Sequence, residues 1–364
     1  MSKLPPLYDS LATHYYWIDL VRFLAAFAVL ACHMRGAFFV EYSLLQPEQQ
    51  TPLMFVFYTL TRFGHEAVLI FFVLSGFLVG GKAIKRIRSN TFDIRSYVID
   101  RAVRIVLPLL SALVLEVIVR HINSKETEMS TLIGNIFSLQ GILCKPYIAT
   151  LWSLSYEVWF YIILCAFACC ILNVKKAKGY VGLTVIFLCF AVFTKLKVYY
   201  LFIWLLGAFG FLYVGKKSRF APYASALALI GLMCALQLTS GSRFGGVYLE
   251  NVRPYIELLF GLIASLFITQ IVNYRPSSKI AIKLNNTGTR LAAFSYTLYL
   301  VHFPVISVLL HFGAPKCETV NIYSVSLYIA WLLIAMLTSY LLYLVFERNT
   351  GKVKGWIKKN INVL

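Results

Sequence analysis

Residues 17–39 read WIDLVRFLAAFAVLACHMRGAFF, a hydrophobic run that nevertheless contains Asp19, Arg22, His33 and Arg35. The run is long enough to cross a bilayer as a helix. Ionisable side chains within a membrane span are costly, and they normally face the interior of a helix bundle or a water-filled cavity. Because a helix turns by about 100° per residue, Arg22 and His33 point within about 20° of one direction and lie about 16 Å apart along the axis. We therefore predict that this helix forms one wall of an internal site.

The composition excludes an ordinary soluble protein. Of 364 residues, 60% are hydrophobic and only 13% are charged, which is typical of a polytopic α-helical membrane protein. The net charge of +19 does not indicate nucleic-acid binding, because the basic residues are interleaved with hydrophobic runs. Residues 1–16 lack the pattern of a cleavable signal peptide, so we expect the first span to be retained.

The eight cysteines include no CxxC pair and show no metal-ligand spacing. Most of them lie within hydrophobic runs, where we expect them to pack as small apolar side chains. Cys144 and Cys317 are expected in extracytoplasmic loops, where a disulfide between them could form in an oxidising compartment. The sequence does not show whether the two cysteines pair.

About ten hydrophobic runs are suited to crossing a membrane. They cover residues 17–39, 58–80, 102–121, 152–172, 180–194, 198–215, 222–239, 254–273, 291–312 and 323–346. The connections between them are short and show no repeat of fixed period. We therefore predict an all-α integral membrane protein with a single transmembrane domain over residues 1–364 and short tails.

Charge alternates between successive connections. Basic residues collect in every second connection and in the tail: Lys82, Lys85, Arg86, Arg88, Arg95, Arg101 and Arg104; Lys175, Lys176 and Lys178; Lys216, Lys217 and Arg219; Arg275, Lys279, Lys283 and Arg290; and Arg348, Lys352, Lys354, Lys358 and Lys359. The remaining connections are poorer in cations and carry acidic residues such as Glu41, Glu126 and Glu318. Because Lys and Arg accumulate in cytoplasmic loops, we predict that both termini are cytoplasmic.

This topology gives each polar residue a depth in the membrane. Asp19 and Arg22 fall near the cytoplasmic side, whereas His33, Glu66 and Glu157 fall in the outer half. His33 is a natural general base, because imidazole titrates near neutral pH and a carboxylate such as Glu157 or Glu66 can orient it. The alternative is a structural histidine that bonds a neighbouring helix. The arginine on the same face and the carboxylates at similar depth favour the functional interpretation.

Arg101 and Arg104, in the segment DRAVRIVLP, lie one helical turn apart at a predicted membrane entrance. Guanidinium groups bind phosphate in a bidentate manner, so nucleotide phosphates are plausible ligands. Ordinary anchoring by positive charges at the cytoplasmic boundary explains the spacing equally well.

Two further segments carry polar residues within spans. Ser75 lies in FFVLSGFLVGG, where small residues permit close helix approach, so packing is our first interpretation of it. His302 lies in YLVHFPV and is followed by Pro304, which bends a helix and frees a backbone carbonyl. His302 is therefore either structural or part of the cavity lining.

Together these stretches resemble the acyltransferase-3 family of integral-membrane acyltransferases, many of which O-acetylate cell-surface glycans. Arg22 and His33 reproduce the family's signature of an arginine, ten residues and a histidine in the first helix. The other matches are FFVLSGF at residues 71–77, the RxxR element of Arg101 and Arg104 ahead of Pro108, WSLSYEVWFY at residues 152–161, and SYTLYLVHFPV at residues 295–305. The resemblance extends over about residues 14–348.

The resemblance implies an acyl-coenzyme A donor, usually acetyl-coenzyme A, and we expect no metal. It implies that His33 and Arg22 are essential and that Arg101 and Arg104 lie at the coenzyme site. We predict catalytic roles for His33, Glu157 and Arg22, coenzyme contacts for Arg101, Arg104 and Ser75, and a place in the substrate cavity for Glu66, His302 and Asp19. Some relatives carry a fused hydrolase-like domain; here we expect transfer to be completed in the membrane bundle or with a separate partner.

The resulting hypothesis is a bacterial inner-membrane O-acetyltransferase that modifies a surface polysaccharide, such as O-antigen, capsule or exopolysaccharide, or its lipid-linked precursor. The expected partners are that glycan and membrane lipids, and no nucleic acid is expected. Direct transfer and an acyl-enzyme intermediate both fit the sequence, as do an acyl group larger than acetyl and a non-glycan acceptor. The alternative from another class is a transporter or flippase of a lipid-linked glycan, in which the buried polar residues form a substrate or proton pathway.

Overall fold

The computed structural model describes residues 15–174, 176–214, 221–238 and 247–361. The predicted basic residues Lys175, Lys216, Lys217 and Arg219 lie outside the described residues. The described part of the chain folds into helices and contains no β-strand, only two isolated bridges, Phe39 with Cys317 and Gln140 with Cys144. The all-α prediction is confirmed.

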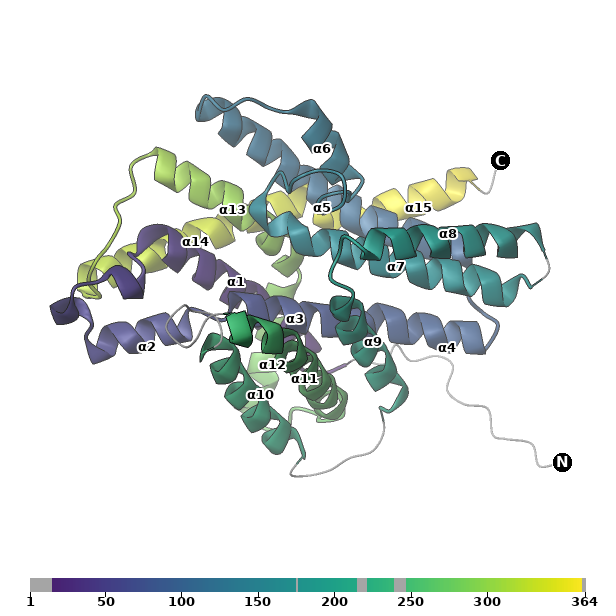
Figure 1. Ribbon diagram of the computed structural model, residues 1–364, viewed down its shortest axis with the longest axis horizontal. Coiled ribbons are helices and arrows are strands. Elements are labelled where there is room, and N and C mark those ends of the chain that lie inside the picture. The colour runs from purple at the N-terminus through teal and green to yellow at the C-terminus, as the bar shows by residue number, and fades with distance from the viewer. Residues whose placement is uncertain (1–14, 175, 215–220, 239–246, 362–364) are drawn as a thin grey trace.

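The α-helices follow one another along the chain as α1 Ile18–Phe38, α2 Pro52–Leu60, α3 Gly64–Ser75, α4 Lys82–Arg88, α5 Ile94–Ile122, α6 Met129–Ile136, α7 Trp152–Leu172, α8 Ala177–Phe193, α9 Tyr199–Leu212, α10 Ala221–Leu238, α11 Val247–Ile271, α12 Lys279–Ala292, α13 Ser295–His311, α14 Ile322–Val345 and α15 Thr350–Ile361 (Figure 1). A π-helical segment, η3 Gly76–Gly81, joins α3 to α4, and the short helices η4 Ala149–Leu151 and η6 Glu347–Asn349 precede α7 and α15.

Length and hydropathy support six or seven membrane spans among the described residues. Six helical stretches qualify directly: Ile18–Phe38, Pro52–Arg88, Ile94–Ile122, Ala149–Leu172, Asn251–Ile271 and Ile322–Asn360. The pair α12 and α13, bent by 58° at its break, gives a seventh if it counts as one span. Three of the ten predicted spans instead correspond to the shorter apolar helices α8, α9 and α10, of 10–17 described residues, which fall below the length of about 20 residues that a bilayer crossing normally needs.

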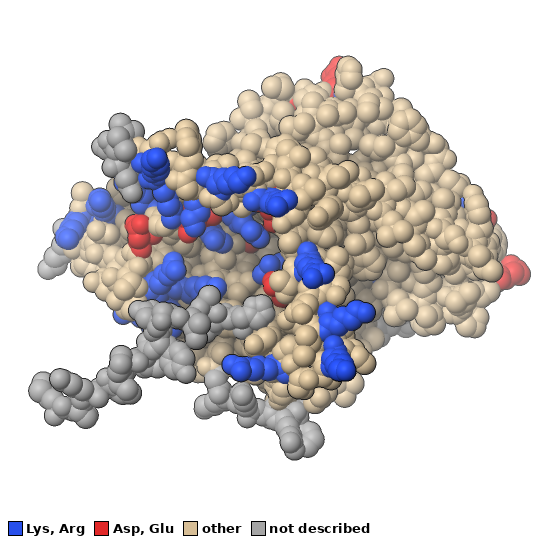
Figure 2. Space-filling view, turned by 180° about the vertical axis from the view of Figure 1, so that it is seen from behind, with Lys and Arg blue, Asp and Glu red and all other residues tan. Residues whose placement is uncertain are grey.

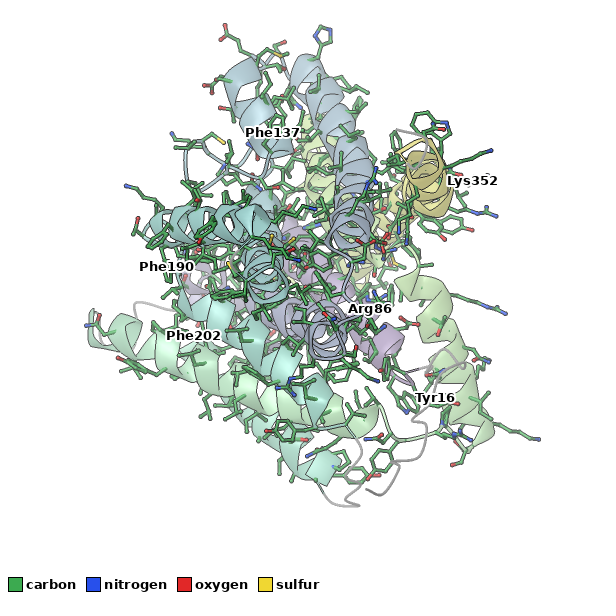
Figure 3. All side chains as sticks on the ribbon, turned by 90° about the vertical axis from the view of Figure 1, so that its right-hand side faces the viewer. Tyr16, Arg86, Phe137, Phe190, Phe202 and Lys352 are labelled. Carbon is green, nitrogen blue, oxygen red and sulfur yellow. The ribbon has the colours of Figure 1, made fainter. Side chains whose placement is uncertain are left out.

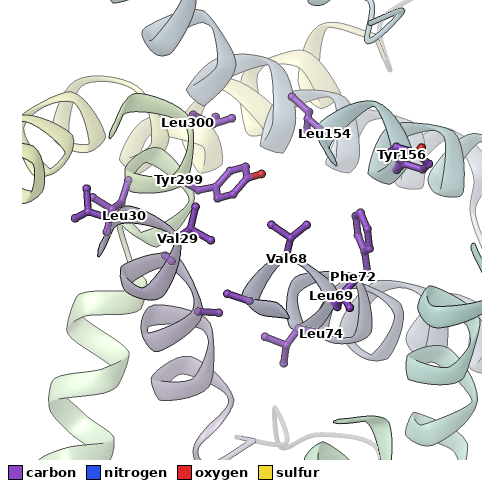
Figure 4. Packing of buried hydrophobic residues seen from close by; sticks show 14 of the residues in the cluster. Val29, Leu30, Val68, Leu69, Phe72, Leu74, Leu154, Tyr156, Tyr299 and Leu300 are labelled. Atoms are coloured by element: carbon purple, nitrogen blue, oxygen red, sulfur yellow. The ribbon is translucent and has the colours of Figure 1, made fainter. Parts of the chain in front are cut away.

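The core lies where α1, α3, α7 and α13 meet. Figure 4 shows buried side chains from these four helices around a common centre: Val29, Leu30, Val68, Leu69, Phe72, Leu154, Tyr299 and Leu300. Aromatic side chains such as Phe190 and Phe202 instead project outward at the margin of the molecule (Figure 3), and both are exposed. Apolar side chains on the outside are the expected surface of a helix bundle that faces lipid.

Close backbone contact joins the α3–η3 helix to α9. A Cβ atom on Gly76 would lie 1.9 Å from the Trp204 carbonyl oxygen, and one on Gly207 would lie 2.1 Å from the Val73 carbonyl oxygen. Only glycine fits at either position, and small residues are the usual means by which membrane helices approach each other closely. The FFVLSGFLVGG motif therefore presses this helix onto α9, with Ser75 at the start of the π-helical segment.

The basic side chains gather at one end of the molecule. Lys82, Lys85, Arg86 and Arg88 on α4 and Lys352, Lys354, Lys358 and Lys359 on α15 belong to this region, which we call the basic end. Figure 2 shows Lys and Arg concentrated over this half of the surface. In Figure 1, α2 and the connection between α13 and α14 lie at the opposite end. Asp100 on α5 binds Lys354 and Lys358 at 2.8 and 3.0 Å and so attaches α15 to the bundle.

Candidate functional site

A cavity of about 530 Å³ opens among α1, α3, α4, α5, α7 and α13. Its polar lining is contributed by Arg22, Ser75, Lys82, Arg86, Tyr97, Asp100, Arg101, Arg104, Ser153, Glu157, Tyr161, Ser295, Tyr296 and Tyr299. The rest of the lining is apolar and includes Val68, Phe71, Phe72, Leu154 and Leu300. A volume of a few hundred Å³ with a mixed lining is typical of a small-molecule or cofactor site.

Five cations line the cavity: Arg22, Lys82, Arg86, Arg101 and Arg104. In the view from the end of the molecule where α4 and α15 lie, Arg86 is near the middle (Figure 3). The structure therefore places Arg101 and Arg104 together on one face of α5, as their spacing predicts, and adds Lys82 and Arg86 from α4. Such a group of cations is suited to bind a ligand that carries several phosphates.

Two of these arginines also bind carboxylates. Arg22 lies 3.3 Å from Asp19, one turn earlier on α1, and both side chains are partly exposed. Arg104 lies 3.4 Å from Glu347, whose side chain is only 1% exposed and which also accepts hydrogen bonds from the backbone and hydroxyl of Thr297. Glu347 thus holds Arg104 toward the bundle while nearly half of that side chain stays exposed.

A directed chain of hydrogen bonds runs along the cavity wall. The indole Nε1 of Trp204 donates to Ser75 Oγ at 3.1 Å, and the Tyr161 hydroxyl donates to Glu157 Oε1. Because the single Tyr161 proton goes to Glu157, the 2.8 Å contact between Ser75 and Tyr161 has Ser75 as its donor. Ser75 is therefore more than a packing residue. The cation of Arg101 lies close to the same group, with its guanidinium carbon 5.9 Å from the centroid of the Tyr161 ring.

His33 and His302 form a hydrogen-bonded pair, which we call the histidine pair. His33 Nδ1 lies 2.9 Å from His302 Nε2, and the two rings are nearly parallel, with an interplanar angle of 6° and centroids 5.1 Å apart. His302 is fully buried. The edge of the Phe303 ring packs on His33, with centroids 5.2 Å apart. The first-helix histidine is therefore held from α13.

Tyr299 connects the cavity to the histidine pair. It lines the cavity, and its ring centroid lies 6.0 Å from that of His302 and 5.7 Å from that of Phe71. Its hydroxyl donates to the Thr150 carbonyl at 3.1 Å and lies 2.6 Å from Ser153 Oγ. Tyr299 thus belongs to the cavity lining and also neighbours the ring of His302.

The partner of His33 differs from the one expected. The sequence suggests that Glu157 or Glu66 orients the imidazole, but the nitrogen contact of His33 is to His302. Glu157 accepts the Tyr161 hydrogen bond, and Glu66, 1% exposed, accepts one from Gln237 Nε2 at 2.9 Å. Depth alone does not decide which side chains meet, because the rotation of each helix about its axis sets the direction of its side chains.

The remaining predicted residues have the following places. Asp19 is the partner of Arg22. Cys144 and Cys317 are both free thiols, each in one of the isolated bridges, so the structure contains no disulfide between them. Pro304 lies within α13, two residues beyond His302.

Several site residues were missed by the sequence reasoning. Tyr161 is one turn after Glu157 in the quoted WSLSYEVWFY segment, so helical spacing could have found it. Tyr299 and Tyr296 precede His302 in the quoted SYTLYLVHFPV segment and give the cavity two more hydroxyl groups. Glu347 and Trp204 gave no such signal, because each reaches the site through a long-range contact.

Residues 15–354 match the model of a protein family described as an acyltransferase domain. The match covers nearly the whole chain and includes every residue placed at the cavity and in the histidine pair. No curated protein and no solved structure matches the chain.

Proposed function

The chain belongs to the acyltransferase-3 family of integral-membrane acyltransferases, and from this premise we propose that it moves an acetyl group from acetyl-coenzyme A to a hydroxyl group of a surface polysaccharide or its lipid-linked precursor. The observation that carries the proposal is that five cations and several hydroxyl groups line the same cavity. Family membership supports acyl transfer itself; the donor and the acceptor are the proposed parts.

The cavity has the chemistry that a coenzyme A thioester requires. Its cations, Lys82, Arg86, Arg101 and Arg104, suit the diphosphate and the 3′-phosphate, because hydrogen bonds between charged groups are about twice as strong as neutral ones. The pantetheine arm is a chain of amide and methylene groups. It would follow the mixed wall toward Tyr299, with hydroxyl groups available for its amides.

His33 is proposed as the general base of the transfer. The acceptor hydroxyl gives its proton to His33 as its oxygen forms a bond to the thioester carbonyl carbon. The carbon–sulfur bond then breaks, and the coenzyme thiolate leaves and recovers the proton. Tyr299 lines the cavity and its ring neighbours His302, so we propose that the thioester approaches the histidine pair on this side of the cavity. Arg22, on the same helix as His33, would hold the donor from the cavity side.

The proposed orientation places the basic end in the cytoplasm. Lys and Arg accumulate on the cytoplasmic side of membrane proteins, and acetyl-coenzyme A is a cytoplasmic metabolite. In a bacterial inner membrane this orientation would bring the donor to the cavity from inside and the glycan to the other end. Cysteine labelling from either side of sealed vesicles, at Arg88→Cys and Leu44→Cys in a variant without accessible native cysteines, tests the orientation.

The activity test uses purified full-length protein with acetyl-coenzyme A and the surface glycan of the strain that encodes it. We expect thiol release that depends on the glycan, together with a gain in glycan mass of one acetyl group per modified site. Glycan movement across vesicles without thiol release would contradict the proposal and favour a transporter. A panel of longer acyl-coenzyme A donors in the same assay identifies the acyl group.

A further inference from the structure

His302 has a proton whose position the structure fixes. Its Nδ1 lies 3.1 Å from the carbonyl oxygen of Leu298, one turn earlier on α13. A carbonyl oxygen can only accept a hydrogen bond, so Nδ1 of His302 is the nitrogen that carries the proton. In a neutral imidazole the other nitrogen, Nε2, then has a free lone pair and can only accept. His302 is fully buried, so water does not compete for either nitrogen.

The orientation of His302 determines the proton on His33. His302 Nε2 accepts, and the atom 2.9 Å from it is His33 Nδ1. His33 Nδ1 therefore carries a proton and donates, which leaves His33 Nε2 as the unprotonated nitrogen of that ring. The chain of donors runs in one direction, from His33 through His302 to the Leu298 carbonyl.

We infer that His302 is a positioning residue that holds His33 in the tautomer with its proton on Nδ1, so that Nε2 of His33 is the atom that takes the acceptor proton. The inference rests on the proposed function, because it assigns a role within that reaction. In the opposite tautomer Nε2 would carry a proton and could not act as a base. A neutral imidazole thus does here what a carboxylate does for the histidine of a hydrolase triad.

The same contact also serves the charged intermediate. When His33 Nε2 takes the proton from the acceptor hydroxyl, the ring becomes an imidazolium with a proton on each nitrogen. Its Nδ1–H still points at the lone pair of His302 Nε2, so the hydrogen bond is kept and becomes charge-assisted. The His33 ring is nearly parallel to that of His302 and packs against Phe303 in a T-shaped contact, and both neighbours restrict its rotation. When the proton passes to the leaving thiolate, the pair returns to its starting state.

The first test reads the tautomer directly, without substrate. The chain has six histidines, so ¹⁵N-histidine labelling gives a small set of imidazole signals, and the spectra of His33→Ala and His302→Leu assign the pair. For the unmodified protein we expect a protonated, pyrrole-type Nδ1 and an unprotonated, pyridine-type Nε2 on His33. A protonated Nε2 on His33 in the unmodified protein would overturn the inference, whatever the activity of the protein.

The second test separates positioning from packing. His302→Gln places an amide oxygen near the former Nε2 position and can accept from His33, whereas His302→Leu fills similar space without an acceptor. We expect His302→Leu to lower kcat by about 10-fold to 10⁴-fold, the range between loss of an orienting partner and a wrong tautomer in a triad, with little change in KM for the donor. We expect His302→Gln to recover a large part of that loss.

Equal kcat values for His302→Gln and His302→Leu in proteins of matched thermal stability would contradict the positioning role. If His302→Leu fails to fold, the tautomer signals of the unmodified protein and the kcat of His302→Gln still decide. A protein with the expected tautomer but no thiol release from acetyl-coenzyme A would refute the proposed function and leave the assignment of the protons intact.

Discussion

The basic end of the cavity and the histidine pair are built on different principles. The Arg104 side chain is 47% exposed, and neighbouring cations from α4 and α5 surround the same opening. His302 is fully buried, and its two nitrogens each have one partner at a fixed distance. Exposed charges attract a ligand of opposite charge, and salt weakens that attraction. A buried chain of hydrogen bonds instead fixes one geometry. The first region should therefore control donor affinity and the second the rate of transfer.

The largest effect is expected at His33. His33→Ala removes the proposed base, and general-base catalysis typically contributes about 10²-fold to 10⁴-fold to a rate. We expect a loss of that size in kcat for thiol release, with donor affinity nearly unchanged because His33 is not among the residues that line the cavity with the cations. His311→Ala is the matched control, since His311 is exposed, bonds Asn123 at 3.0 Å and does not line the cavity. A folded His33→Ala protein with a normal rate of thiol release would contradict the role of His33 as the general base.

The next largest effect is expected at Arg101 and Arg104. A hydrogen bond to a charged group contributes about 1.5–3 kcal/mol, so each single alanine variant should bind acetyl-coenzyme A about 10-fold to 100-fold more weakly, and the double variant at least about 100-fold more weakly. We expect kcat at saturating donor to change little. Affinity of the unmodified protein should fall as salt is raised, and the double variant should depend less on salt.

Arg88→Ala is the control for this prediction. Arg88 is an exposed cation of the same basic end that does not line the cavity. Isothermal titration with acetyl-coenzyme A compares the variants in one detergent. Equal affinity in the double variant and in Arg88→Ala would show that the two arginines only anchor the helix at the membrane boundary. Because Arg104→Ala also leaves buried Glu347 without its cation, Arg101→Ala alone is the cleaner single variant.

The third prediction concerns the α3–η3 helix, which contributes Ser75, Leu78 and Val79 to the cavity lining. Gly76→Ala would place a Cβ atom 1.9 Å from the Trp204 carbonyl oxygen, which is backbone and cannot turn aside. Overpacking of this kind typically costs about 1–3 kcal/mol, so we expect a lower thermal unfolding midpoint and reduced donor affinity. Gly36→Ala is the control, because its Cβ would have nothing within 4 Å and alanine favours a helix. Equal stability of the two variants would refute the close contact between the α3–η3 helix and α9.

The same two regions show how far the sequence leads. Residues joined by helical spacing on one segment were predictable: Arg101 with Arg104 at one opening, and Arg22 with His33 on one helix. His302 was also singled out, as a polar residue next to Pro304 within a predicted span. The pairing of His33 with His302 was not predictable, because it depends on how α1 and α13 are rotated against each other. Glu157 and Glu66 were predicted partners of His33 because they lie at a similar depth, but the nitrogen contact of His33 is to His302. Glu347 was missed because its link to Arg104 joins distant parts of the chain.

The smallest effect is expected in the hydrogen-bond chain of the wall. Tyr161→Phe removes the hydroxyl that donates to Glu157, and a typical hydrogen bond within a protein contributes about 0.5–1.5 kcal/mol to stability. Ser75→Ala instead leaves the Trp204 Nε1–H without its acceptor, and an unpaired buried donor costs about 1–3 kcal/mol. In Tyr161→Phe the Ser75 hydroxyl also loses its acceptor, but it can turn to the backbone carbonyl one helical turn earlier, whereas the indole N–H is fixed by its ring. We therefore expect Ser75→Ala to lower the thermal unfolding midpoint more than Tyr161→Phe. Equal thermal unfolding midpoints for Ser75→Ala and Tyr161→Phe would show that the Trp204 Nε1–H does not depend on Ser75 as its acceptor.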